Sequence, residues 1–278
     1  MDLEHRLDAV WDLLDQGDAS AALDLAERLA RDNQQRPEAQ LALAMAAYYN
    51  DLPEASKRAA ERVLTLVEAE GVTDQSDCAG AARLILAQNA FRVWDFQTAE
   101  AMAREALARG ADDAEAWDLL ARVLEQTGRW SEAAEADLRA AQADPEAFPP
   151  PNRISDDDME QAVQEAIDEL PEALRELAEE APIILETFPS PEMSAPTAPG
   201  TLPLAPDILG LFVGLPRSEQ SIFTTADTPS AIFLFKGNLE RMCPDRSALV
   251  EEIVVTLHHE LAHYLGFEEG DMPGLGLA

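Results

Sequence analysis

Apolar residues recur every three or four positions over residues 1–145, which is the period of an amphipathic helix. The same stretch is rich in Ala, Leu, Glu, Asp and Arg and poor in β-branched residues, a composition that favours helix. Beyond residue 180 the pattern changes to short apolar runs that predict strands. These runs are residues 183–186, 209–213 and 231–235. The pattern therefore predicts a mostly helical N-terminal part and a small α+β C-terminal part.

A longer repeat is superimposed on the helical period. Residues 116–145 contain a first helix, a turn centred on Gly128, and a second helix that Pro145 ends. Three weaker copies precede it, and alanines at matching places in the second helices stand at 22, 55, 99 and 133, spaced by 33, 44 and 34 residues. This resembles the tetratricopeptide repeat, a helical hairpin of about 34 residues. An insertion over residues 70–77 accounts for the longer interval, and a generic helical bundle is the alternative.

A proline-rich stretch separates the two parts of the chain. The run Phe148-Pro149-Pro150-Pro151-Asn152 continues neither a helix nor a central strand, because proline lacks an amide donor and fixes φ. A new helix then extends from about Met159 to Glu180, with a break or kink at Pro171. We therefore predict tetratricopeptide-like repeats at 1–146, a linker at 147–157 and a second domain at 158–278.

The charge balance excludes some partners. The chain has 54 acidic and 20 basic residues, a formal net charge of −34. Nucleic acid and anionic membranes would be repelled, so we expect neither as a partner. Solubility is the simplest reason for the charge, and a preference for basic peptides is the more specific alternative. The chain lacks a signal-like N-terminus and any apolar run of about 18 residues, so we expect a cytoplasmic protein.

The last predicted helix, from about Ser247 to Leu265, carries the candidate chemistry. It contains His259-Glu260-Leu261-Ala262-His263, the HExxH pattern of zincins. A spacing of four residues places both imidazoles on one side of the helix, close enough to bind one metal ion. On a helical projection the histidines and Thr256 point away from the apolar arc. A solvated helix with incidental histidines is the alternative.

Catalysis by such a site needs a base and a third protein ligand. Zinc lowers the pKa of bound water from 15.7 to about 7, and Glu260 would take the proton as general base. Gly266 permits a left-handed turn that ends the helix, so the chain can return toward the metal. Glu269 stands three residues further on and is the candidate third ligand, with Glu268 and Asp271 as alternatives. For His258 we expect a supporting or neutral role rather than ligation.

Several motifs together resemble the minimal zincin-like metallopeptidases over about residues 155–272. They are a Leu170-Pro171 step, the apolar strand at 183–186, the segment Leu209-Gly210-Leu211-Phe212-Val213-Gly214, the apolar strand at 231–235, and the terminal His-Glu helix. The resemblance implies Zn²⁺ bound by His259 and His263, with Glu260 as the base. It also implies an acidic ligand after the glycine, here Glu269, where the family usually has aspartate.

The implied function is zinc-dependent hydrolysis of a peptide or protein substrate, with the repeats recruiting an unidentified protein or peptide. The alternative is a non-catalytic or weakly active interaction scaffold with a metal-binding zincin-like domain. The strand at 231–235 is a candidate edge strand for pairing with an extended substrate, or else a strand buried by its own apolar run. We expect the four tryptophans to pack between helices.

Overall fold

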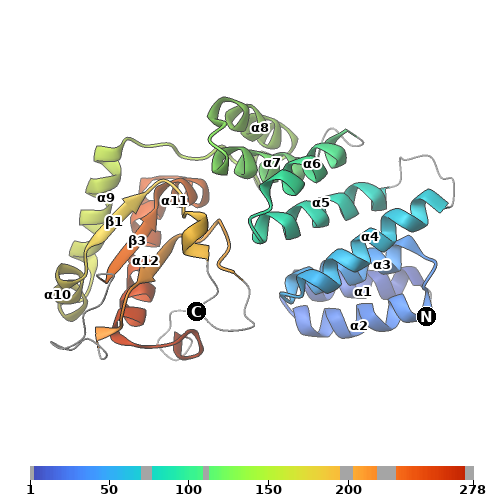
Figure 1. The fold of residues 1–278 in the computed structure, drawn as a ribbon, viewed down its shortest axis with the longest axis horizontal. Helices are drawn as coiled ribbons and strands as arrows, with labels where there is room; N and C mark the ends of the chain where they lie inside the picture. The colour runs from blue at the N-terminus through green and yellow to red at the C-terminus, as the bar shows by residue number, and fades with distance from the viewer. Residues whose placement is uncertain (1–2, 70–76, 109–112, 195–202, 218–229, 273–278) are drawn as a thin grey trace. The chain divides into compact units, whose positions relative to one another are not determined.

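The computed structural model describes residues 3–69, 77–108, 113–194, 203–217 and 230–272. It divides into two compact units, Met1–Pro149 and Pro150–Ala278 (Figure 1). In its described residues the first unit consists of helices arranged as four successive hairpins. These are α1 (Leu3–Asp15) with α2 (Ala19–Asp32), α3 (Pro37–Tyr49) with α4 (Pro53–Ala69), α5 (Asp77–Arg92) with α6 (Phe96–Leu107), and α7 (Ala114–Gln126) with α8 (Trp130–Ala143).

The turn inside each hairpin has the same backbone geometry. A residue with positive φ ends the first helix in all four: Gly17 at 77°, Asp51 at 56°, Trp94 at 65° and Gly128 at 73°. In each case the next residue's amide donates to the carbonyl five residues before it, at 2.8–3.0 Å. The four positions are spaced by 34, 43 and 34 residues. The predicted helical repeat array is therefore confirmed, with one longer interval in the middle.

Small residues lie where the two helices of a hairpin cross. Ala22, Ala99 and Ala133, which mark three of the predicted repeats, are buried. The second copy differs, because the buried residue there is Ser56 and not the half-buried Ala55. The Ser56 hydroxyl donates to the Ala44 carbonyl at 2.8 Å and accepts from an amide side chain of α5 at 2.8 Å, so the serine is satisfied. When Ser56 takes the place of Ala55, the four crossing residues are spaced by 34, 43 and 34 positions. The predicted insertion at 70–77 lies almost entirely outside the described residues.

The second unit packs helices against one face of a mixed three-stranded sheet. The strand order is β1-β3-β2, with β1 parallel and β2 antiparallel to β3. The predicted helix from 159 to 180 is two helices, because the chain breaks at Leu170-Pro171. The element bounds are α9 (Asp156–Glu169), α10 (Glu172–Glu180), β1 (Ile183–Glu186), η1 (Pro191–Ser194), β2 (Gly210–Val213), β3 (Ala231–Phe235), α11 (Lys236–Met242), α12 (Arg246–Leu265) and η3 (Glu269–Asp271).

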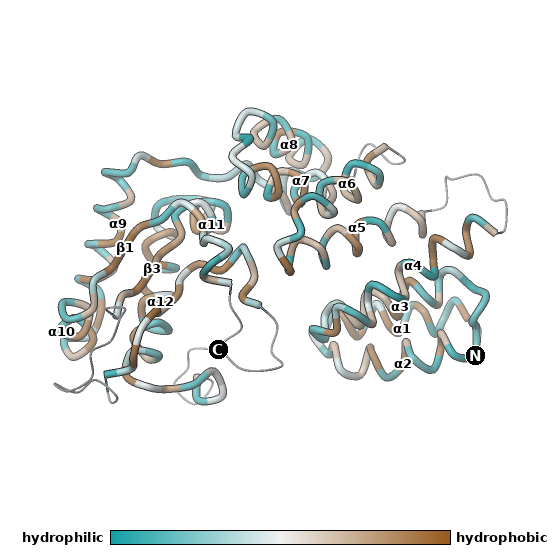
Figure 2. Tube along the Cα trace, in the orientation of Figure 1, coloured by the Kyte–Doolittle hydropathy of each residue, from teal (hydrophilic) through white to brown (hydrophobic). Residues whose placement is uncertain are grey.

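The strand β3 lies in the middle of the sheet. Its residues Ala231, Ile232, Leu234 and Phe235 are buried, and it is among the most hydrophobic segments of the unit (Figure 2). Both of its edges are already paired, so the hypothesis that it binds an extended substrate is wrong and the alternative, a buried strand, holds. The open edges of this sheet, as far as the structure describes it, belong to β1 and β2.

The core of the second unit forms between the sheet and helices α9 and α12. Ile232 and Leu234 point from β3 into it and meet Met159 of α9 together with Leu257 and Leu261 of α12. This packing fixes α12, and with it the candidate chemistry, against the sheet. None of the described helices is both long and apolar enough to cross a membrane.

Candidate metal centre

The ends of helix α12 are defined by local hydrogen bonds. The Asp245 side chain accepts from the Ala248 amide at 3.0 Å and caps the start of the helix. Gly266 adopts φ 99° at the other end. Its amide bonds to the His263 carbonyl at 2.9 Å, and the Phe267 amide bonds to the Ala262 carbonyl at 3.1 Å, which is the Schellman pattern. The chain therefore turns back directly after the second histidine, as predicted.

The two histidines converge at one point. The Nε2 atoms of His259 and His263 are 3.2 Å apart, and the ring centroids are 4.9 Å apart at an interplanar angle of 72°. Two nitrogen ligands of a tetrahedral zinc ion, each at about 2.0–2.1 Å, are separated by about 3.3–3.4 Å. The pair therefore fits a shared metal ion; a hydrogen bond between the two rings fits the same distance.

The tautomer of His263 is set by its surroundings. Its Nδ1 lies 3.0 Å from the backbone carbonyl oxygen of Phe267. A carbonyl only accepts, so Nδ1 is the donor, and in the neutral ring Nε2 then carries the lone pair that faces His259. This arrangement, in which the outer nitrogen donates to a carbonyl, is typical of metal-binding histidines.

Glu260 lies on the side of α12 that faces the sheet. It is 7 % exposed, and its Oε2 accepts from the backbone amide of Phe212 in β2 at 2.6 Å. This close approach depends on Gly210. A Cβ atom there would lie 2.5 Å from Cγ2 of Thr256 and 3.2 Å from Cγ of Glu260. The sequence pattern did not predict the Phe212 amide as a partner, because nothing local to α12 reveals it.

The burial of Thr256 corrects the helical projection. Thr256 was expected on the open side of α12, but it is 7 % exposed and packs on β2. One helical turn beyond Glu260, the ring of Tyr264 packs on Phe212 with centroids 5.7 Å apart. Thr256, Glu260 and Tyr264 thus form a row along β2, so α12 buries two faces. The half-buried histidines lie beside this row.

The third ligand stays a prediction. The backbone of Glu269 lies in η3, three residues beyond Gly266, but its side chain is outside the described part of the chain. Of the two alternatives, Glu268 is exposed, and Asp271 accepts from the Glu268 amide at 2.9 Å through Oδ2. The described side chains form no group of three or more potential His, Cys, Asp or Glu metal ligands.

His258 lies beside the pair without joining it. Its Nε2 is buried and has no hydrogen-bond partner among the described residues. Burial lowers the pKa of the imidazole, because removal from water disfavours the charged form. A neutral ring agrees with the supporting or neutral role that we expect for His258. That role stays a prediction.

Comparisons with known proteins found a family match for the second unit and similar solved structures. Residues 178–277 match the family described as "Zincin-like metallopeptidase". The chain is similar to the solved structure titled "Crystal structure of MamA", with 20% identity, a TM-score of 0.40, and coverage of 48% of this chain and 73% of that chain. It is also similar to "Crystal structure of YrrB: a TPR protein with an unusual peptide-binding site", with 14% identity, a TM-score of 0.39, and coverage of 52% and 70%. No curated protein matches the sequence. The chain is thus an array of tetratricopeptide-like hairpins followed by a region that matches the zincin-like metallopeptidase family.

Proposed function

We propose that the C-terminal unit is a zinc-dependent peptidase. His259 and His263 would hold the metal through Nε2, and Glu269 would supply the third ligand. The observation that carries this proposal is the 3.2 Å separation of the two Nε2 atoms, together with the lone pair that the Phe267 carbonyl leaves on His263 Nε2. A bound zinc ion would supply a Lewis acid and a water of lowered pKa.

The protein groups would then orient and move protons. The Glu260 carboxylate would accept a proton from water and later deliver it to the leaving amine nitrogen. Its hydrogen bond to the Phe212 amide supports this role, because the bond fixes the orientation of the carboxylate. The helical repeats would recruit the protein or peptide substrate, since such arrays offer an extended binding surface.

A second function is favoured by the same hydrogen bond. Glu260 is buried and joins α12 to β2, so its carboxylate also has a structural role. In that case the chain would be a protein-interaction scaffold whose zincin-like domain binds metal for stability and hydrolyses little or nothing.

Metal analysis and a peptide library distinguish the two functions. Wild type should bind about one zinc per chain, His263→Ala should lose it, and His5→Ala in α1 should keep it as the matched histidine control. Glu260→Gln should keep the zinc and abolish cleavage of the library. Zinc binding with no cleavage by wild type would support the scaffold, and absence of zinc from wild type would refute the peptidase.

A further inference from the structure

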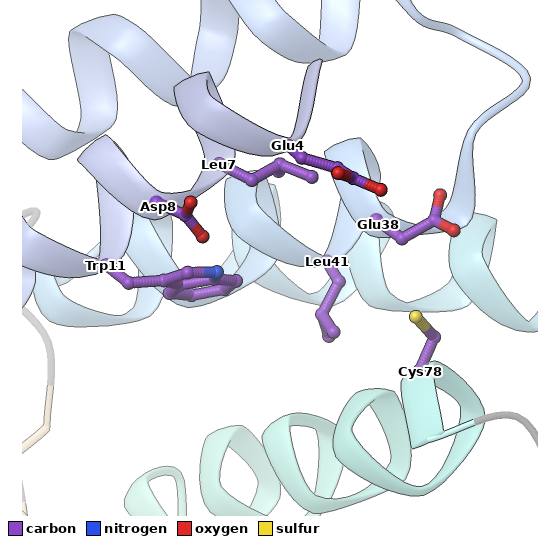
Figure 3. A pocket seen from close by; sticks show the side chains of 7 residues that line it. All are labelled: Glu4, Leu7, Asp8, Trp11, Glu38, Leu41 and Cys78. Carbon is purple, nitrogen blue, oxygen red and sulfur yellow. The ribbon is translucent and has the colours of Figure 1, made fainter. Parts of the chain in front are cut away.

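The first helices of the four hairpins form a surface with a defined pocket. Helices α1, α3, α5 and α7 contact one another in sequence order. A pocket of about 270 Å³ opens where α1 and α3 meet the start of α5 (Figure 3). It is lined mainly by Glu4, Leu7, Asp8 and Trp11 of α1 and by Glu38 and Leu41 of α3.

The pocket combines an apolar floor with carboxylates. Leu7 is buried, and Trp11 and Leu41 are half-buried, so the floor offers an indole ring and aliphatic carbon. Glu4 and Asp8 are exposed and precede Trp11 by seven and three residues, so the three share one side of α1. Neither carboxylate forms an ion pair within the described part of the chain.

The surrounding helices add no free positive charge to this surface. Helices α1, α3, α5 and α7 contain no lysine, and each of their arginines pairs with a carboxylate. The pairs are Arg6–Asp32, Arg83–Glu105, Arg92–Asp51 and Arg122–Asp118. Of the pocket acids, Glu38 has a cation partner, Arg36, at 3.2 Å. Glu4 and Asp8 therefore leave uncompensated negative charge beside an aromatic floor.

We propose that this pocket binds a lysine or arginine side chain of a basic partner peptide. The aliphatic stem would lie on Leu7 and Leu41, and the cationic group would sit over Trp11 beside Asp8, with Glu4 adding attraction from the same side of α1 (Figure 3). A cation next to an indole face and carboxylates gains both cation–π and Coulomb attraction. The apolar floor favours an organic cation over a metal ion, which prefers oxygen ligands on all sides. The proposal specifies the recruiting role assigned above to the repeats and needs no metal.

The test uses the full chain with EDTA present and a fluorescein-labelled peptide of alternating lysine and alanine. Binding is measured by fluorescence anisotropy at low and at physiological salt. Glu4→Gln/Asp8→Asn should weaken binding at least about tenfold. The matched double variant Asp24→Asn/Glu27→Gln removes the same charge from exposed positions of α2 and should change binding less than about twofold. Trp11→Leu should weaken binding while leaving net charge unchanged. Circular dichroism checks that each variant is folded.

Three outcomes would overturn the proposal. One is equal weakening of peptide binding by the two double variants, which would mean that the peptide is attracted by the overall negative charge of the chain. Another is equally tight binding of a peptide with glutamate in place of lysine, and the third is no binding by wild type. EDTA removes zinc from this assay, so peptide binding is measured without any contribution from the metal. The peptidase hypothesis is tested separately by zinc content and cleavage, so the two proposals can fail independently.

Discussion

The carboxylate of Glu260 accepts a hydrogen bond from the backbone amide of Phe212, with a donor–acceptor distance of 2.6 Å. The strand β2 is at the edge of the sheet and pairs with β3 on its other side, so this amide is available to a side chain. The bond joins residues 48 positions apart in the sequence. It therefore makes the geometry of the proposed base depend on the sheet as well as on α12.

A proline in β2 tests whether this amide positions Glu260. Phe212→Pro removes the donor and is tolerable in an edge strand, so we expect cleavage to fall roughly ten- to hundredfold with zinc retained. Phe212→Ala keeps the amide and loses only the ring packed on Tyr264. It should keep most of the cleavage rate and lower the free energy of unfolding by about 2–3 kcal/mol. Equal loss of cleavage in both variants would show that the amide does not matter.

The close contact at Gly210 predicts a second effect. Gly210→Ala would place Cβ 2.5 Å from Cγ2 of Thr256, and we expect a loss of about 1–3 kcal/mol in unfolding free energy. Adding Thr256→Ser removes that methyl group and should restore part of the loss. As a control, Gly80→Ala in α5 meets no atom within 4 Å and should stabilise the chain by about 0.5–1 kcal/mol. Urea unfolding measures the free energy of unfolding of each variant. An unchanged free energy of unfolding in the Gly210 variant would mean that α12 shifts freely over β2.

Alanine substitution identifies the third metal ligand. Glu269→Ala should weaken zinc binding at least about a hundredfold, and Glu269→Asp should retain it, since the family usually has aspartate there. Glu268→Ala should bind like wild type. Asp271→Asn, which keeps an acceptor for the Glu268 amide, should do the same. Competition with a chromogenic chelator gives the affinities, and zinc loss in the Glu268 or Asp271 variant alone would assign the ligand to that residue.

Glu115 predicts a pH-dependent contribution to stability. Burial raises the pKa of this carboxyl, nearby Asp113 adds to the shift, and the hydrogen bond from Gln88 opposes it. Folding is therefore favoured while the carboxyl is protonated, and this stability is lost as pH rises from about 4.5, the unfolded value, through the folded pKa. Glu115→Gln should be more stable than wild type at neutral pH, with the difference disappearing in acid. Glu61→Gln, at an exposed position of α4, is the control. The free energy of unfolding is measured with urea at several pH values. The same pH dependence in the Glu115 and Glu61 variants would contradict the prediction.

Glu240 predicts a structural role for a buried carboxylate in α11. Its side chain is 5% exposed and accepts from Arg153 at 2.9 Å and from the Ile154 amide at 3.0 Å. Glu240→Ala leaves these donors without their acceptor and should lower the unfolding free energy by about 2–4 kcal/mol. Glu165→Ala breaks the exposed pair with Arg246 and should have a much smaller effect in the same unfolding experiment. Equal losses of unfolding free energy in the Glu240 and Glu165 variants would mean that burial of Glu240 does not increase its contribution to stability.

Local signals in the sequence predicted much of the fold. The apolar runs predicted β1 and β3 at their observed bounds, Pro171 predicted the break between α9 and α10, and Gly266 predicted the end of α12. Each of these features depends on residues within one helical turn or one strand. The resemblance to zincin-like metallopeptidases, over about residues 155–272, overlaps the match to that family at residues 178–277.

Contacts between distant residues escaped prediction. Ser56 replaces alanine at a helix crossing because its hydroxyl finds partners 12 and 33 residues away. Asp51 and Trp94 adopt positive φ without glycine, so the repeat turn was visible only at Gly17 and Gly128. The helix α11 follows β3 directly, with no turn signal between them, and was not predicted.

The hydrogen bond between His263 and the Phe267 carbonyl has a wider consequence. Phe267 also closes the Schellman turn through its amide, so the same few residues end the helix and aim the imidazole. Residues 262–267 therefore set the orientation of the His263 ring locally, and we expect a change that opens this turn to release the ring as well.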